Sequence, residues 1–234
     1  MKWDLKDNWV TLLVVIYFAN AVIEVIAEYF SCKPILYLTK PLIPFLLMVL
    51  YFYNSTKRNW FFFLIMTFSL ITNILFIPSD TKILFYGVIC FTIHRMLLLI
   101  LVFKIIKIKD YIPFSLATLP LGFIFFYLLT ATEVPENSFY LLIFTNLLAS
   151  VLGGVAISSY VMNDSKQNSL LLISVLLFLG LQLVVFIEKY YFADSHSALL
   201  RPLAMTLNAL AFFAFYTFVI SSEKLNYNRS SFAG

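Results

Sequence analysis

The residues of this sequence that could do chemistry are a few ionisable side chains set inside long apolar runs. The clearest case is GVICFTIHRMLLLIL, Gly87 to Leu101, which places His94 and Arg95 side by side near its middle. An imidazole can donate or accept a proton and a guanidinium can bind an anion, so this pair could serve acid–base chemistry on a charged substrate. Other apolar runs hold further groups of this kind: Glu24, Glu28, Lys40, Glu188 and Arg201, with the amides Asn20, Asn73, Gln182 and Asn208.

The elements that position these groups must be membrane-spanning helices. The chain of 234 residues is 62% hydrophobic and only 12% charged, and its mean hydropathy is +0.94, whereas a soluble domain has roughly 25% charged residues. A charge at the bilayer centre costs about 2.5–3.5 kcal/mol even on insertion scales. Each ionisable group inside a span therefore needs a partner, water or a function.

Polar breaks divide the chain into eight apolar runs without the alternation of β-barrel strands. We therefore expect an all-α polytopic membrane protein with one eight-helix domain over residues 1–222 and a short disordered cytoplasmic tail over 223–234. The first run has no small-residue cleavage site, so we interpret it as a retained helix. The expected helices lie near residues 9–30, 35–53, 60–77, 83–103, 111–131, 138–162, 169–190 and 199–221.

The distribution of lysine and arginine predicts the orientation. With the N-terminus inside, the outer segments hold only Lys33, Lys82 and Lys189, and the other loop cations fall on the inner side, so the positive-inside rule places both termini in the cytoplasm. We expect the bacterial inner (cytoplasmic) membrane. The net charge of +4 reflects this topology and not nucleic-acid binding. Cys32 and Cys90 fall in different segments without metal-ligand spacing, so we predict no disulfide, metal site or cofactor.

Depth along the helices suggests a shared cavity. A rise of 1.5 Å per residue places Glu24, Lys40, Asn73 and Gln182 in the outer halves of their helices and the 94–95 pair near the midplane. Polar groups from several helices thus overlap in height, as a cavity open to the outer face requires. The alternative is that they only dock helices, and for Glu28, Glu188 and Arg201 a solvated or anchoring role competes. Asn20 and Asn208 are expected to be helix–helix contacts.

Two stretches resemble a known family. LTKPLIPFLLMVLYF, with Lys40 and Pro41 entering the second run, and FYGVICFTIHRMLLLILVF, with Phe85, Gly87 and His94, are similar to signatures of the YhhN family, whose vertebrate relatives are the TMEM86 lysoplasmalogenases. Eight spans and the chain length agree with that resemblance. It implies hydrolysis of the vinyl-ether bond of a lysoplasmalogen, which releases a fatty aldehyde.

The sequence departs from the family pattern at two acidic positions. FSLITNILF has Asn73, and LFLGLQLVVFIEKY has Gln182, where the family carries aspartates. Vinyl-ether cleavage needs a proton donor and an anion to stabilise an oxocarbenium ion, and amides can neither titrate nor carry the charge. The third and seventh runs are four helices apart and parallel, which hints at a 4+4 internal repeat with these amides in equivalent places.

Three functions fit the sequence. The first is lysoplasmalogenase-like hydrolysis of a lysolipid, with His94 as acid, Glu24 or Glu188 as the replacement carboxylate, and Lys40, Asn73, Arg95 and Gln182 as substrate-binding residues. The second is a catalytically inactive relative that binds lipid or supports a membrane complex. The third is a small-molecule transporter, for which buried carboxylates would relay protons. The expected partner in each of the first two is a membrane lipid or lysolipid in the bilayer; no protein partner follows from the sequence.

Overall fold

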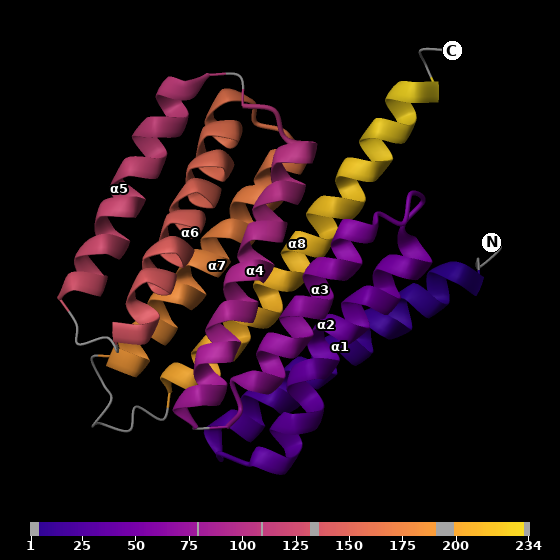
Figure 1. Cartoon of the computed structure of the whole chain (residues 1–234). Coiled ribbons are helices and arrows are strands. Elements are labelled where there is room, and N and C mark those ends of the chain that lie inside the picture. The colour runs from indigo at the N-terminus through magenta and orange to yellow at the C-terminus, as the bar shows by residue number, and fades with distance from the viewer. Residues whose placement is uncertain (1–4, 79, 109, 132–135, 191–198, 232–234) are drawn as a thin grey trace.

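The computed structural model describes residues 5–78, 80–108, 110–131, 136–190 and 199–231, with the backbone alone at 5–7, 136, 137, 190 and 226–231. Every regular element in these ranges is an α-helix, which confirms the predicted all-α class (Figure 1). The helices are α1 (Leu5–Tyr29), α2 (Lys33–Asn54), α3 (Trp60–Leu75), α4 (Thr81–Ile105), α5 (Tyr111–Thr130), α6 (Glu136–Met162), α7 (Lys166–Tyr190) and α8 (Leu200–Ser231).

The polar breaks set the helix boundaries because their side chains cap the next helix. The Asn59 side chain accepts a hydrogen bond from the Phe61 amide at 3.0 Å and begins α3. Asp80 accepts from the Lys82 amide at 2.8 Å and begins α4, and Asp110 begins α5 in the same way. These caps satisfy amides that have no partner within the helix. Three of the polar breaks predicted from the sequence therefore carry the residues that begin helices.

Seven of the described helices are long and apolar enough to cross a membrane, which indicates an integral membrane protein. The exception is α3, whose 16 residues span about 24 Å at 1.5 Å per residue. The sequence predicted this helix at 60–77, but it ends at Leu75, shortly before Pro78, as helices usually do before proline. The hydrocarbon core is about 30 Å thick, so α3 is the one predicted span that falls short of it.

The structure differs from the sequence prediction at the C-terminal tail. The chain is helical over residues 223–231, where we expected a disordered tail, because α8 continues to Ser231. The reason lies at Glu223, which is buried. Its carboxylate accepts hydrogen bonds from the Tyr51 hydroxyl and, at 2.6 Å, from the Ser55 hydroxyl, both near the end of α2. These contacts anchor the first residue of the segment to the end of α2.

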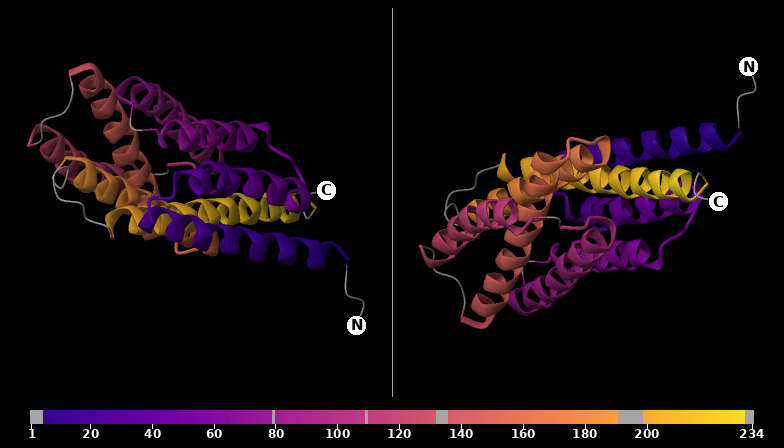
Figure 2. Two further views of the ribbon diagram at one scale, coloured as in Figure 1. Left: turned by 90° about the horizontal axis from the view of Figure 1, so that it is seen from below. Right: turned by 90° about the horizontal axis from the view of Figure 1, so that it is seen from above.

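The helices form one bundle in which α1 begins and α8 ends at the same end (Figures 1 and 2). α1 packs against α2 and α8, α7 against α8, and α4 against α6. α5 lies at one edge and packs on α6 (Figure 1). Its outward side chains Leu116, Leu119 and Phe123 are 68–71% exposed, as expected for a face that lipid chains solvate.

Candidate functional site

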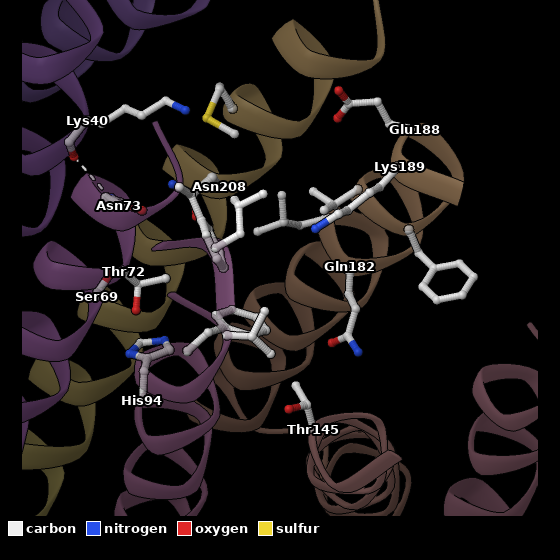
Figure 3. A pocket seen from close by; sticks show the side chains of 18 of the residues that line it. Lys40, Ser69, Thr72, Asn73, His94, Thr145, Gln182, Glu188, Lys189 and Asn208 are labelled. Carbon is white, nitrogen blue, oxygen red and sulfur yellow. Dashed lines mark hydrogen bonds between the residues drawn. The ribbon is translucent and has the colours of Figure 1, made fainter. Parts of the chain in front are cut away.

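The bundle contains a cavity of about 340 Å³ to which every helix except α5 contributes lining residues. This volume lies within the range of small-molecule sites. The cavity reaches the end of the bundle where α1 joins α2 and α7 approaches α8, opposite the end that holds the start of α1 and the end of α8. The predicted meeting of polar side chains from separate helices is therefore present in the structure (Figure 3).

Charged residues lie at the open end of the cavity. The Lys40 Nζ forms an ion pair with the Glu28 Oε1 at 2.5 Å, and both side chains are at least 93% buried. Across the opening, the Arg201 Nε donates to the Glu188 Oε1 at 2.5 Å, with the arginine side chain 57% exposed. Lys189 also lines this end. The mouth thus presents both signs of charge.

His94 lies at the inner end, beside Ser69 and Thr72 of α3 (Figure 3). The imidazole is 2% exposed, and its Nδ1 is 3.0 Å from the carbonyl oxygen of Ile65. Because a carbonyl can only accept, Nδ1 carries the proton and neutral His94 keeps a lone pair on Nε2. The Phe212 ring, 5.5 Å away between centroids, packs against the imidazole. The backbone of α3 therefore fixes the tautomer of a histidine in the cavity wall.

The Arg95 side chain points away from the cavity, because successive residues of an α-helix are rotated by about 100° about its axis. Its guanidinium lies between the rings of Phe91 and Phe178, 5.0 and 4.8 Å from their centroids. The Nη2 is 3.5 Å from the Phe178 carbonyl oxygen, and Nε and Nη1 have no acceptor within the described chain. Arg95 does not line the cavity, so the structure places it behind the two rings that do.

The Asn73 side chain makes a hydrogen bond between helices that requires an amide. Pro44 lies inside α2 and has no N–H to bond the carbonyl of Lys40, four residues earlier. The Asn73 Nδ2 donates to that carbonyl at 3.0 Å (Figure 3). An ionised aspartate, which only accepts, could not replace this donor.

Gln182 binds a second amide on the opposite wall. Its Nε2 donates to the Asn146 Oδ1 at 2.5 Å, while the Asn146 Nδ2 is 3.4 Å from the carbonyl of Phe125. The Gln182 Oε1 is buried and no donor reaches it in the part of the chain that the structure covers. Asn73 and Gln182 are therefore both amides that link helices.

Glu24 is 1% exposed but is not among the cavity residues. Its Oε1 has no hydrogen-bond partner among the described residues, and the nearby Lys40 ammonium contacts Glu28 instead. Glu28 stands one helical turn beyond Glu24 on α1, so it occupies the cavity position that we expected Glu24 to hold.

Of the predicted site residues, the structure brings five together in the cavity wall and leaves Glu24 and Arg95 outside it. Several lining residues were assigned other roles or none. Glu28 and Arg201 were expected to be solvated or anchoring residues, Asn208 a helix contact and Lys189 an outer-side cation, while Thr145 and Asn146 were not singled out. The adjacent polar residues in FTNLLAS of α6 are a sequence signal that could have identified Thr145 and Asn146. The five predicted residues in the wall are His94, Glu188, Lys40, Asn73 and Gln182.

Comparison of the chain with protein-family models, curated proteins and solved structures finds no match.

Proposed function

We propose that this cavity binds a single-chain lipid with a charged head group and that the protein hydrolyses its vinyl-ether bond, as a lysoplasmalogenase does. The observation that carries the proposal is the order of chemistry along one cavity. Its mouth has the ion pairs Glu28–Lys40 and Glu188–Arg201. Its depth is lined by neutral polar groups, aromatic rings and His94. An amphiphile has the same order, from head group through a glycerol linker to an apolar chain.

The reaction assigns a task to His94. Transfer of a proton from His94 to the β-carbon of the vinyl ether gives an oxocarbenium ion, and water then adds to the α-carbon and returns a proton to the imidazole. The hemiacetal loses the glycerol oxygen as an alcohol and leaves an aldehyde, so one water is consumed. Because Nδ1 bonds Ile65, Nε2 must first take up a proton, and this is the proton that His94 delivers to the β-carbon. Glu188 or Glu28, released from its cation, would be the carboxylate that stabilises the oxocarbenium ion.

Lipid binding without catalysis is the second candidate, and the pairing of the carboxylates favours it. Glu28 and Glu188 line the cavity, and each contacts a cation. Glu24 lies outside the cavity wall, and positions 73 and 182 are amides. Among the described residues, a site in this state has no free anion to stabilise an oxocarbenium ion, whereas it can still bind a head group and a chain.

Transport receives less support from the helices. Unwound segments at mid-depth are typical of transporter sites. Pro41 and Pro44 lie inside α2 and Pro120 inside α5, and both helices continue through them. The described helices thus provide no broken segment at the cavity.

For the membrane placement we propose that α3 also crosses the bilayer, completing eight spans, and that both termini are cytoplasmic in the bacterial inner membrane. The basic loops support this orientation. A 4+4 repeat would relate α3 to α7, which contribute Asn73 and Gln182 to opposite walls of one cavity.

The test is aldehyde release by the purified protein from a 1-alkenyl lysolipid, beside binding of the 1-alkyl analogue that cannot be cleaved. We expect wild-type turnover, loss of at least about 100-fold in His94→Ala, a range typical of removing a general acid, and little change in Ser69→Ala on the same wall. Binding without turnover would establish the second candidate. If wild type neither binds nor cleaves, the proposal is wrong.

A further inference from the structure

A basic surface lies at the end of the bundle where α8 ends, opposite the mouth of the cavity (Figure 1). Lys57 and Arg58 lie in the loop between α2 and α3, and Lys104 lies in the last turn of α4. We call these three exposed cations the basic patch. Neither 54–62 nor 103–108 contains an acidic residue, and none of the three cations forms an ion pair with a side chain that the structure describes. The basic patch thus receives no anion from this part of the chain.

Aromatic rings place the basic patch at the level of the lipid head groups. Trp60 begins α3 with an exposed side chain, and exposed tryptophans at helix ends mark the interface between membrane and water. The Arg58 guanidinium is 4.2 Å from the centroid of the Phe52 ring, which is exposed in the last turn of α2. The Lys104 Nζ is 3.4 Å from the centroid of the Phe61 ring in the first turn of α3. Cations that rest on interfacial rings lie where lipid phosphates lie.

The backbone of Arg58 is strained and is held in place from α8. Its φ is 45°, a left-handed conformation that costs residues other than glycine on the order of 1 kcal/mol. The Arg58 amide donates to the Ser55 Oγ at 2.8 Å, and that hydroxyl donates to the buried Glu223 carboxylate. Strain of this kind persists only where the surrounding structure enforces it. The network therefore fixes the direction in which the arginine leaves the loop.

We propose that the basic patch binds the phosphate of an anionic phospholipid in the leaflet that surrounds this end of the bundle. The Arg58 guanidinium can donate two parallel hydrogen bonds to a phosphate, and Lys57 and Lys104 act as point charges beside it. A head group with its own ammonium, such as phosphocholine, gains less because that ammonium meets the same cations. The basic patch lies at the opposite end from the cavity mouth, so this inference does not depend on the proposed function.

The experiment is native mass spectrometry of the full chain released from nanodiscs that contain equal amounts of phosphatidylglycerol and phosphatidylcholine. Wild type should retain phosphatidylglycerol over phosphatidylcholine by about tenfold, because several cations at a lipid surface act together. The double variant Arg58→Gln/Lys104→Gln should bring that preference below about twofold. The control Lys33→Gln/Lys82→Gln removes two exposed lysines at the opposite end of the bundle and should keep the preference.

Thermal unfolding in phosphatidylcholine nanodiscs gives a second measurement. Added phosphatidylglycerol should raise the unfolding midpoint of wild type and of the control more than that of the double variant, because a ligand that binds the folded state stabilises it. Equal retention of both lipids by wild type, or an undiminished preference in the double variant, would overturn the inference. An equal loss of preference in the control would overturn it too, since total charge alone would then be the cause. A failure of the proposed function would show separately, as absent binding of the lysolipid.

Discussion

Position 73 illustrates how a residue identity can follow from the backbone of another helix. Pro44 deprives the Lys40 carbonyl of its helical donor, and the Asn73 amide supplies one from α3. The neutral amide, which departs from the acid of the resembling family, is thus accounted for by hydrogen bonding alone. The amide at position 73 does not show whether the protein has a catalytic acid. The proposed function assigns that role to His94, and the His94→Ala variant tests it.

This pairing predicts a coupling between positions 44 and 73. Asn73→Leu should lower the free energy of unfolding in micelles by about 1–2 kcal/mol, because it leaves a buried carbonyl without a donor. Asn73→Asp should cost more, since its carboxylate would face the carbonyl oxygen. In a Pro44→Ala background, residue 44 regains the N–H that bonds Lys40, and the cost of Asn73→Leu should fall below about 0.5 kcal/mol. Equal costs in both backgrounds would refute the coupling.

At the scale of elements, α5 depends on close contact with α6. A Cβ at Gly154 would overlap the Thr118 hydroxyl and lie 3.2 Å from the Phe114 carbonyl oxygen. At Gly122 the nearest atom, the Ser150 Oγ, is 3.9 Å from the added Cβ, which is an ordinary contact. Small residues allow membrane helices to approach in this way, so the two glycines of one interface differ in what they tolerate.

We therefore expect Gly154→Ala to destabilise the protein by about 1–3 kcal/mol through overpacking, while Gly122→Ala changes the unfolding midpoint little. The stiff Thr118 side chain cannot move away easily because its hydroxyl donates to Phe114 at 2.8 Å. Adding Thr118→Ala to Gly154→Ala should recover part of the loss. Thermal unfolding of the four proteins checks this, and equal effects at the two glycines would contradict the packing.

At the scale of the whole molecule, the sequence predicts the helices well because hydropathy and capping residues are local signals. The loops that contain Asn59, Asp80 and Asp110 lie where the polar breaks indicated. The continuation of α8 was missed because its anchor joins Glu223 to Tyr51 and Ser55, far away in the chain. No local pattern reports such a contact.

The sequence predicted that a polar cavity exists, but not which residues line it. Depth along a helix follows from the sequence, so His94, Lys40 and Gln182 were expected at overlapping heights. The direction of a side chain around its helix depends on packing, and this separates Arg95 from His94 and Glu24 from Glu28. Choosing between such neighbours requires knowing which helix lies beside which.

The account depends on a single-chain lipid entering this cavity, and photo-crosslinking tests that most directly. The probe is a 1-O-alkyl lysolipid with a diazirine in its chain, and mass spectrometry locates the adducts. The account predicts adducts on cavity residues such as Val88, Leu142 and Phe178 that excess unlabelled lysolipid abolishes. Adducts confined to the outward face of α5, at Leu116, Leu119 or Phe123, with no such competition would contradict it.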